Sequence, residues 1–284
     1  MAVIRDVMPV FELFQPATVA DTLSLLDRYG AEAWLMAGGL DTFDWLKDRA
    51  KRTSIVIDLS QVAELRGIRE VNGGLEIGAL TTLTAVGQHP VVREQFGLLM
   101  EAAELVASPQ IRNQGTLGGN ISQDTRCWYY RSGWTCYRAG GNICYADTPT
   151  AINIVRMTVL EPGELLTTIR IPATWAGAQF YFEKVRDRNV WDFPLVNVAS
   201  AIKFSGETIQ AARIAVGAVA ARPLRLANVE AAIAGKPRNE DTAKMAGEMA
   251  VDGATPLRYN GYKIPLMRNL VKRAIRGTGA TATT

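Results

Sequence analysis

The chain has 284 residues, enough for one large domain or two to three subdomains. Hydrophobic residues make up 48% and charged residues 21%, a balance typical of soluble globular proteins. The 31 Lys and Arg barely exceed the 28 Asp and Glu, so charge does not indicate nucleic-acid binding. No apolar run reaches the roughly 20 residues of a membrane span, and the first nine residues lack a secretory signal's apolar block. We therefore expect a soluble, cytoplasmic protein.

The histidine content excludes two kinds of site. The only one is His89, and Pro90 follows it directly, so we expect it at a helix end. A His-dependent catalytic triad or a multi-His metal site cannot be built from this chain alone. Chemistry must therefore come from a bound cofactor or from other residue types.

The N-terminal part of the chain alternates short strands and helices. Thr18 is placed to cap a helix that Gly30 ends. A short apolar strand at 33–36 runs into a glycine pair, after which Asp41 is expected to cap a second helix. A buried strand, SIVIDL, is expected at 54–59.

The rest of the chain predicts hairpins and helices. Residues 68–80 contain Asn72-Gly73-Gly74, a hairpin signal, and Thr81 or Thr82 is expected to cap a short helix. Helices are predicted at 91–106, 225–234, 240–251 and 266–276, and antiparallel strands at 180–185, 196–204 and 208–219. Residues 278–284 are small and polar, which predicts a disordered tail. The predicted class is α+β.

Two glycine loops are candidates for ligand binding. Ala37-Gly38-Gly39-Leu40-Asp41 joins a buried strand to a helix N-terminus, and Thr116-Leu117-Gly118-Gly119-Asn120 repeats the pattern. Paired glycines let a backbone approach a ligand closely, and a helix N-terminus favours a pyrophosphate. Neither loop is a Rossmann fingerprint or a P-loop. Tight turns explain many single Gly-Gly pairs, but two such loops favour a dinucleotide site.

Three segments together resemble a known family. LMAGGLDTFDWLK (35–47), SPQIRNQGTLGGNIS (108–122) and FEKVRDRNVWDFPLVNVASAI (182–202) are similar to the xanthine dehydrogenase/CO dehydrogenase flavoprotein family. The resemblance covers nearly the whole chain. It implies a vanillyl-alcohol-oxidase-like FAD fold, with FAD-binding subdomains at 1–59 and 60–175 and a C-terminal domain at 176–284.

The resemblance also implies the residues that contact FAD. The two loops would line its pyrophosphate and ribityl chain, and Leu166 and Lys184 match positions near the flavin. For Leu166 an ordinary strand position, and for Lys184 a solvated strand lysine, are the alternatives. The expected FAD-binding residues are Ala37, Gly38, Gly39, Leu40, Asp41, Thr42, Ser108, Thr116, Gly118, Gly119, Asn120, Asp124, Leu166 and Lys184.

All three cysteines lie within 18 residues, at Cys127, Cys136 and Cys144. Metal ligation is the favoured interpretation for such a cluster in an intracellular chain; structural thiols and a redox disulfide are alternatives. The C-x8-C-x7-C spacing is wider than that of zinc ribbons or ferredoxins.

The cysteine segment resembles an insert of the same family. DTRCWYYRSGWTC followed by GGNIC, at about 124–150, is similar to the insert of 4-hydroxybenzoyl-CoA reductase and periplasmic-type aldehyde oxidoreductases. That resemblance implies a [4Fe–4S] cluster on four cysteines. The fourth ligand and an expected segment between Asn153 and Met157 are missing from this sequence. Either the segment is deleted or the sequence is an incomplete record, which the matching flanks favour.

The resemblance predicts an oxidoreductase subunit that passes electrons and does not handle the substrate. Electrons would come from a molybdenum cofactor on a large subunit and [2Fe–2S] clusters on a small one, through FAD, to an external acceptor. No residue of this chain needs to act as acid, base or nucleophile. Such complexes can also be exported with a signal-bearing partner, so a periplasmic site stays open. The rivals are a stand-alone FAD oxidoreductase of the same fold and a zinc-binding scaffold.

Overall fold

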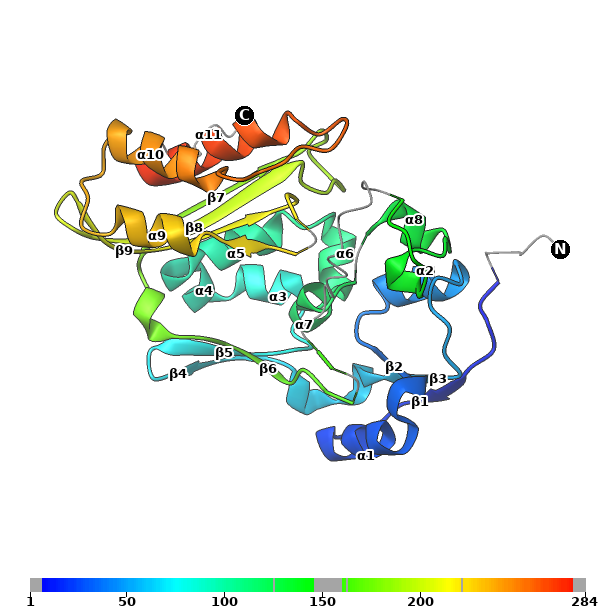
Figure 1. Ribbon diagram of the computed structural model, residues 1–284. Helices are drawn as coiled ribbons and strands as arrows, with labels where there is room; N and C mark the ends of the chain where they lie inside the picture. Colours follow the sequence, from blue (N-terminus) through cyan, green and yellow to red (C-terminus); the bar gives the residue numbers. More distant parts are fainter. Residues whose placement is uncertain (1–6, 125, 146–159, 162, 221, 278–284) are drawn as a thin grey trace. The chain divides into compact units, whose positions relative to one another are not determined.

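The computed structural model describes residues 7–124, 126–145, 160–161, 163–220 and 222–277 (Figure 1). Its contacts divide the chain into two compact units. The first unit comprises Met1–Val86 and Gln110–Ala173, and the second comprises Gly87–Pro109 and Thr174–Thr284.

A small parallel sheet lies at the N-terminal end of the first unit. Its strand order is β1 (Glu12–Phe14), β3 (Ile55–Asp58) and β2 (Ala33–Met36). Every residue of β3 is buried, as expected for a central strand covered on both faces. The helix α1 (Val19–Tyr29) contributes Leu26 to the same hydrophobic core.

The two N-terminal helices start differently. Thr18 caps α1 as predicted, because its side chain accepts a hydrogen bond from the Asp21 amide, and Gly30 ends the helix. The helix α2 (Leu40–Lys47) begins one residue before the predicted cap. Its N-cap is Gly39, in the left-handed conformation at φ 77°, so the prediction that Asp41 caps this helix is wrong.

The second sheet of the first unit is antiparallel, in the order β4 (Ile68–Val71), β5 (Gly74–Gly78) and β6 (Thr168–Ile171). The predicted hairpin at 68–80 is confirmed, and its turn residues Asn72 and Gly73 have φ of 51° and 74°. Four short helices follow along the chain: α3 (Leu83–Gln88), α6 (Pro109–Gln114), α7 (Leu117–Ile121) and α8 (Trp128–Arg131).

One predicted helix is broken in two. The segment 91–106 forms α4 (Pro90–Gln95) and α5 (Gly97–Glu104), separated by Phe96 at φ −133° and ψ 45°. Phe96 is only 4% exposed, so burial of its ring accompanies the break. His89 is the N-cap of α4, at a helix end as predicted.

The second unit is built on a four-stranded antiparallel sheet in the order β10-β9-β8-β7. Helices α9, α10 and α11 lie on one side of this sheet and α5 on the other (Figure 1). Apolar residues from the strands and the three helices form its hydrophobic core. The elements are β7 (Gln179–Val185), β8 (Val196–Ser205), β9 (Thr208–Gly217), β10 (Leu224–Arg225), α9 (Ala227–Ile233), α10 (Glu240–Ala250) and α11 (Lys263–Arg276).

Short 3-10 turns complete the described elements, at Gly30–Glu32, Leu59–Gln61, Ala63–Leu65, Tyr137–Ala139 and Ala173–Trp175. The mixed architecture confirms the predicted α+β class. The predicted divisions at 59/60 and 175/176 both stay predictions. The predicted tail and the region of the missing segment lie outside the described residues.

Candidate functional site: two glycine loops in contact

The structure brings the two glycine loops together. A Cβ added to Gly38 would overlap the backbone carbonyl oxygen of Gln114, two residues before Thr116. The Gln114 side-chain amide donates to the Gly38 carbonyl at 3.2 Å. A Cβ on Gly119 would lie 3.5 Å from that of Ala37. The loops are therefore packed backbone to backbone, which only glycine permits at position 38.

The first loop presents unused backbone donors. Gly39 has no side chain to accept from the first turn of α2, and no side-chain cap is present. Within the described residues, no acceptor takes the amide N–H groups of Leu40, Asp41 and Thr42. These groups, at the positive end of the helix, suit an anionic ligand.

The second loop was expected to repeat the ligand-binding pattern of the first, but most of its backbone amides already have acceptors within the protein. Four of its five amides donate within the protein: Leu117 to the Thr81 carbonyl, Gly118 to the Ala79 carbonyl, Gly119 to the Thr116 hydroxyl and Asn120 to the Thr116 carbonyl. Gly118 is packed so closely that an added Cβ would lie 2.7 Å from both the Cβ and the carbonyl oxygen of Ala79. The second loop therefore provides a tightly packed wall, and the free donors come from the first.

Asp41 and Thr42 have different surroundings. Thr42 is buried, and its hydroxyl accepts from the indole Nε1 of Trp34 at 3.1 Å. Asp41 Oδ1 lies 2.6 Å from Nη1 of Arg126. Asp41 Oδ2 is buried and accepts no hydrogen bond in the described part of the chain, so it stays available to a hydroxyl donor.

Asp124, predicted to bind FAD, is engaged by cations of the protein. Its Oδ2 lies 2.9 Å from Lys51 Nζ, and its Oδ1 pairs with Arg138. Lys51 also lies over the rings of Trp34, Trp45 and Tyr130. Burial works to lower the pKa of Lys51, but its hydrogen bonds to Tyr130 and Asp124 outweigh burial and raise that pKa. Asp124 therefore anchors the cysteine segment to the α2 region.

Backbone hydrogen bonds link the neighbourhood of Leu166 to the second loop. It is half-buried and precedes β6 by two residues, so the strand position expected as its alternative is not formed. The neighbouring Thr167 carbonyl accepts from the Ala79 amide, and the Ala79 carbonyl accepts from Gly118. Ala79 thus connects Thr167, the residue after Leu166, to Gly118 of the second loop.

Ser108 and Lys184 belong to the second unit. Ser108 is buried at 6% exposure. Lys184 Nζ donates to the Leu105 carbonyl at 2.8 Å, at the C-terminal end of α5. Burial and the Arg186 charge lower the pKa of Lys184. Trp191 donates its amide to the Ala107 carbonyl at 3.0 Å, so two contacts hold the segment that leads to Ser108.

The cysteines do not form a metal site in the described geometry. Cys127 and Cys136 pack in a small core with Trp45 and Tyr130, whereas Cys144 is not part of that core. No group of three or more His, Cys, Asp or Glu among the described residues is placed to hold a metal ion. The three thiols as arranged here therefore do not fit an iron–sulfur cluster.

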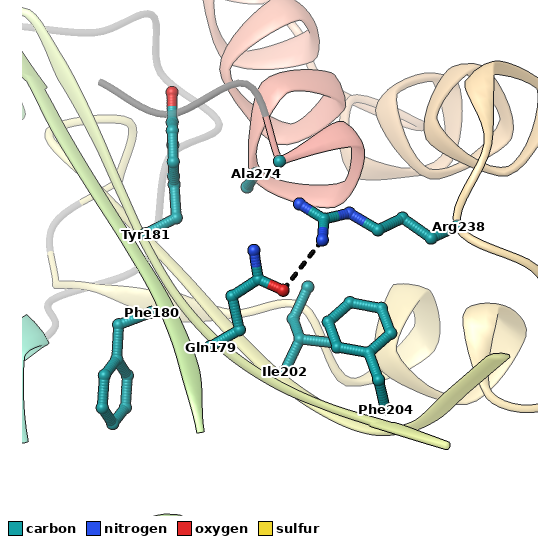
Figure 2. A pocket seen from close by; sticks show the side chains of 8 residues that line it. Gln179, Phe180, Tyr181, Ile202, Phe204, Arg238 and Ala274 are labelled. Atoms are coloured by element: carbon teal, nitrogen blue, oxygen red, sulfur yellow. Dashed lines mark hydrogen bonds between the residues drawn. The ribbon is translucent and has the colours of Figure 1, made fainter. Parts of the chain in front are cut away.

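Neither of two cavities in the described residues is lined by a predicted site residue. A space of about 50 Å³ in the second unit is lined by residues that include Gln179, Tyr181 and Arg238. Figure 2 shows Arg238 donating to the Gln179 side chain, a bond of 2.8 Å. This space is far below the roughly 300 Å³ of a small-molecule pocket. A groove of about 460 Å³ runs along β1 and α1.

Comparison with protein families accounts for both parts of the chain. Residues 9–174 match the FAD binding domain in molybdopterin dehydrogenase, and residues 180–278 match the CO dehydrogenase flavoprotein C-terminal domain. The chain therefore belongs to the family of FAD-binding medium subunits of xanthine/CO dehydrogenase-type molybdenum hydroxylases. The predicted family and its oxidoreductase class are confirmed.

Relatives of known function cover almost the entire chain. The carbon monoxide dehydrogenase medium chain of Hydrogenophaga pseudoflava is 31% identical over 96% of this chain and 98% of its own. The corresponding medium chain of Afipia carboxidovorans is 30% identical over 93% and 96%.

Solved structures confirm the fold. A chain of carbon monoxide dehydrogenase from Hydrogenophaga pseudoflava, lacking the Mo-pyranopterin moiety, superimposes with a TM-score of 0.80 at 29% identity, covering 95% of this chain and 97% of that chain. Quinoline 2-oxidoreductase from Pseudomonas putida 86 gives a TM-score of 0.77 at 26% identity over 95% and 96%. None of the helices in the described residues combines the length and apolar character that a membrane span requires.

Proposed function

We propose that this chain is the electron-transfer subunit of a molybdenum hydroxylase and holds FAD at the two touching glycine loops. The observation that carries the proposal is the contact of Gly38 with Gln114, beside the open amides of α2. A family match over residues 9–174 to an FAD binding domain supports the identity of the ligand.

The residues of the first unit fit a dinucleotide. The amides of Leu40, Asp41 and Thr42 would donate to the pyrophosphate, as the positive end of α2 favours. Gly118, packed against Ala79, and Gly119, beside Ala37, would form the wall against which the cofactor lies. Bound there, FAD would supply the capacity to take up and release electrons singly or in pairs.

Ser108 and Lys184, both in the second unit, stay predicted FAD contacts. Within that unit the Leu105 carbonyl holds the Lys184 ammonium in place. The protein's part is to bind, orient and electrostatically tune the cofactor. We assign no acid, base or nucleophile to this chain.

Partner subunits follow from the relatives. Two relatives, at 31% and 30% identity, are medium chains of carbon monoxide dehydrogenases, and one similar solved structure is a Cu,Mo-CO dehydrogenase. We therefore propose a large molybdopterin-binding subunit that handles the substrate and a small [2Fe–2S] subunit that feeds electrons to this chain. An external acceptor would take them from the flavin. A cytoplasmic site, or a periplasmic one by co-export, stays a prediction.

The predicted [4Fe–4S] cluster has less support than the FAD site. The resemblance predicted it on Cys127, Cys136 and Cys144 with a fourth ligand that this sequence lacks. Among the described residues, these three thiols are not placed as a group that could hold a metal ion. We therefore assign no electron-transfer step to a cluster on this chain.

Metal and flavin analysis of the purified complex tests this proposal. We expect FAD at one per copy of this chain and no iron or zinc beyond what the partner subunits hold. Visible absorption separates the cases, because flavin and iron–sulfur clusters absorb and zinc does not. Excess iron that Cys136→Ser removes would establish the cluster, and excess zinc would favour the scaffold function. Turnover of a small substrate by this chain alone would favour a stand-alone oxidoreductase.

A further inference from the structure

The cysteine segment is bound to α2 by opposite charges. Arg126 pairs with Asp41, and Arg131 Nη2 lies 3.7 Å from Asp44 Oδ2. The Lys51–Asp124 pair and the Trp45–Tyr130 ring contact, with centroids 5.7 Å apart, join the same surfaces. In Figure 1, α8 of this segment lies beside α2. Four charged or aromatic contacts thus place the segment against the helix that follows the first glycine loop.

One of these contacts is at the ligand end of the helix. Asp41 is in the first turn of α2, the turn whose amides are open. A carboxylate within one helical turn of a bound pyrophosphate would repel it, because both groups are negatively charged and like charges at such distances repel each other strongly near a protein surface. Arg126 Nη1, at 2.6 Å, offsets the Asp41 charge, and the two side chains are 33% and 23% exposed.

We propose that Arg126 is a positioning residue for FAD, which neutralises Asp41 and links the segment after the second glycine loop to the first loop. The inference rests on the proposed placement of FAD at these loops. The cysteine segment then has a role that needs no iron, because it places the Arg126 guanidinium at the pyrophosphate end of the site.

A double-mutant cycle on the full chain tests this role, with the FAD dissociation constant measured by titrating the flavin-free protein. Arg126→Met is expected to weaken FAD binding about tenfold when Asp41 is present, and less than about twofold in the Asp41→Asn background. Arg126→Lys, which keeps the charge, should retain most of the affinity. Because salt screens exposed charges, the Arg126→Met defect should shrink as salt is raised.

Arg131→Met is the matched control, since it removes another cation of the same segment, paired with the 64% exposed Asp44. We expect FAD affinity close to that of the unmodified chain. An equal loss in both Met variants, or a loss independent of Asp41, would mean that Arg126 only anchors the segment and would overturn the inference. If the unmodified chain bound no FAD, the proposed function itself would fail.

Discussion

Substituting Gly38 with alanine is expected to leave the protein with less than about a tenth of its FAD, because the new Cβ would overlap the Gln114 carbonyl. That oxygen is backbone and sits just before the second glycine loop, so the loops would have to move apart. The measurement is the FAD content of the purified Gly38→Ala chain, released by denaturation and quantified by chromatography.

A matched glycine controls for general loss of stability. Gly97 begins α5, and an added Cβ there would meet nothing within 4 Å. We expect Gly97→Ala to keep its full FAD content. Retention of FAD by Gly38→Ala would contradict the proposed contact between the loops.

The second large effect is expected on stability, at Glu230. This carboxylate is 6% exposed on α9 and accepts from the buried Ile214 amide at 2.9 Å. Arg225 Nη2, at 2.6 Å, and Arg213 Nη1, at 3.4 Å, offset its charge. Glu230→Ala would leave an amide unpaired and a cavity, so we expect the second unit to lose about 3 kcal/mol. Calorimetric melting of the full chain would measure this loss.

The pH dependence of this unit follows from the same carboxylate. Burial tends to raise the pKa of Glu230, but the Arg225 and Ile214 hydrogen bonds outweigh it and hold the pKa below its ordinary 4.5. A carboxylate whose pKa is lowered by folding stabilises the folded state at pH values above its pKa in the unfolded chain. This stabilisation is lost as the pH falls through its pKa in the folded state. The stability difference between the unmodified chain and Glu230→Ala should therefore shrink in acid below about pH 4. As a control, substituting the exposed Glu240 with glutamine should leave the melting temperature close to that of the unmodified chain.

Local chemistry made much of the fold predictable. Thr18 and Gly30 delimit α1 because capping is decided by neighbouring residues, and the Asn72-Gly73 hairpin is fixed by its turn. Both glycine loops could also be found from the sequence. Their mutual contact could not, because Gly38 and Gln114 are 76 positions apart and no local pattern pairs them.

Other features depend on tertiary contacts. The break at Phe96 is decided by where its ring is buried, which helical periodicity does not reveal. The Arg126 pairing with Asp41 had no sequence signal beyond opposite charges far apart in the chain. Asp124 matched an FAD position by family resemblance, yet in the structure Lys51 and Arg138 engage its carboxylate.

The most direct test of the central claim is the flavin stoichiometry of the full-length chain purified by itself. The protein should contain, or take up, one tightly bound FAD per chain, released intact on denaturation and identified as FAD by chromatography. A chain that binds no flavin, or that binds FMN as well as FAD, would contradict a site built around the pyrophosphate at the two glycine loops.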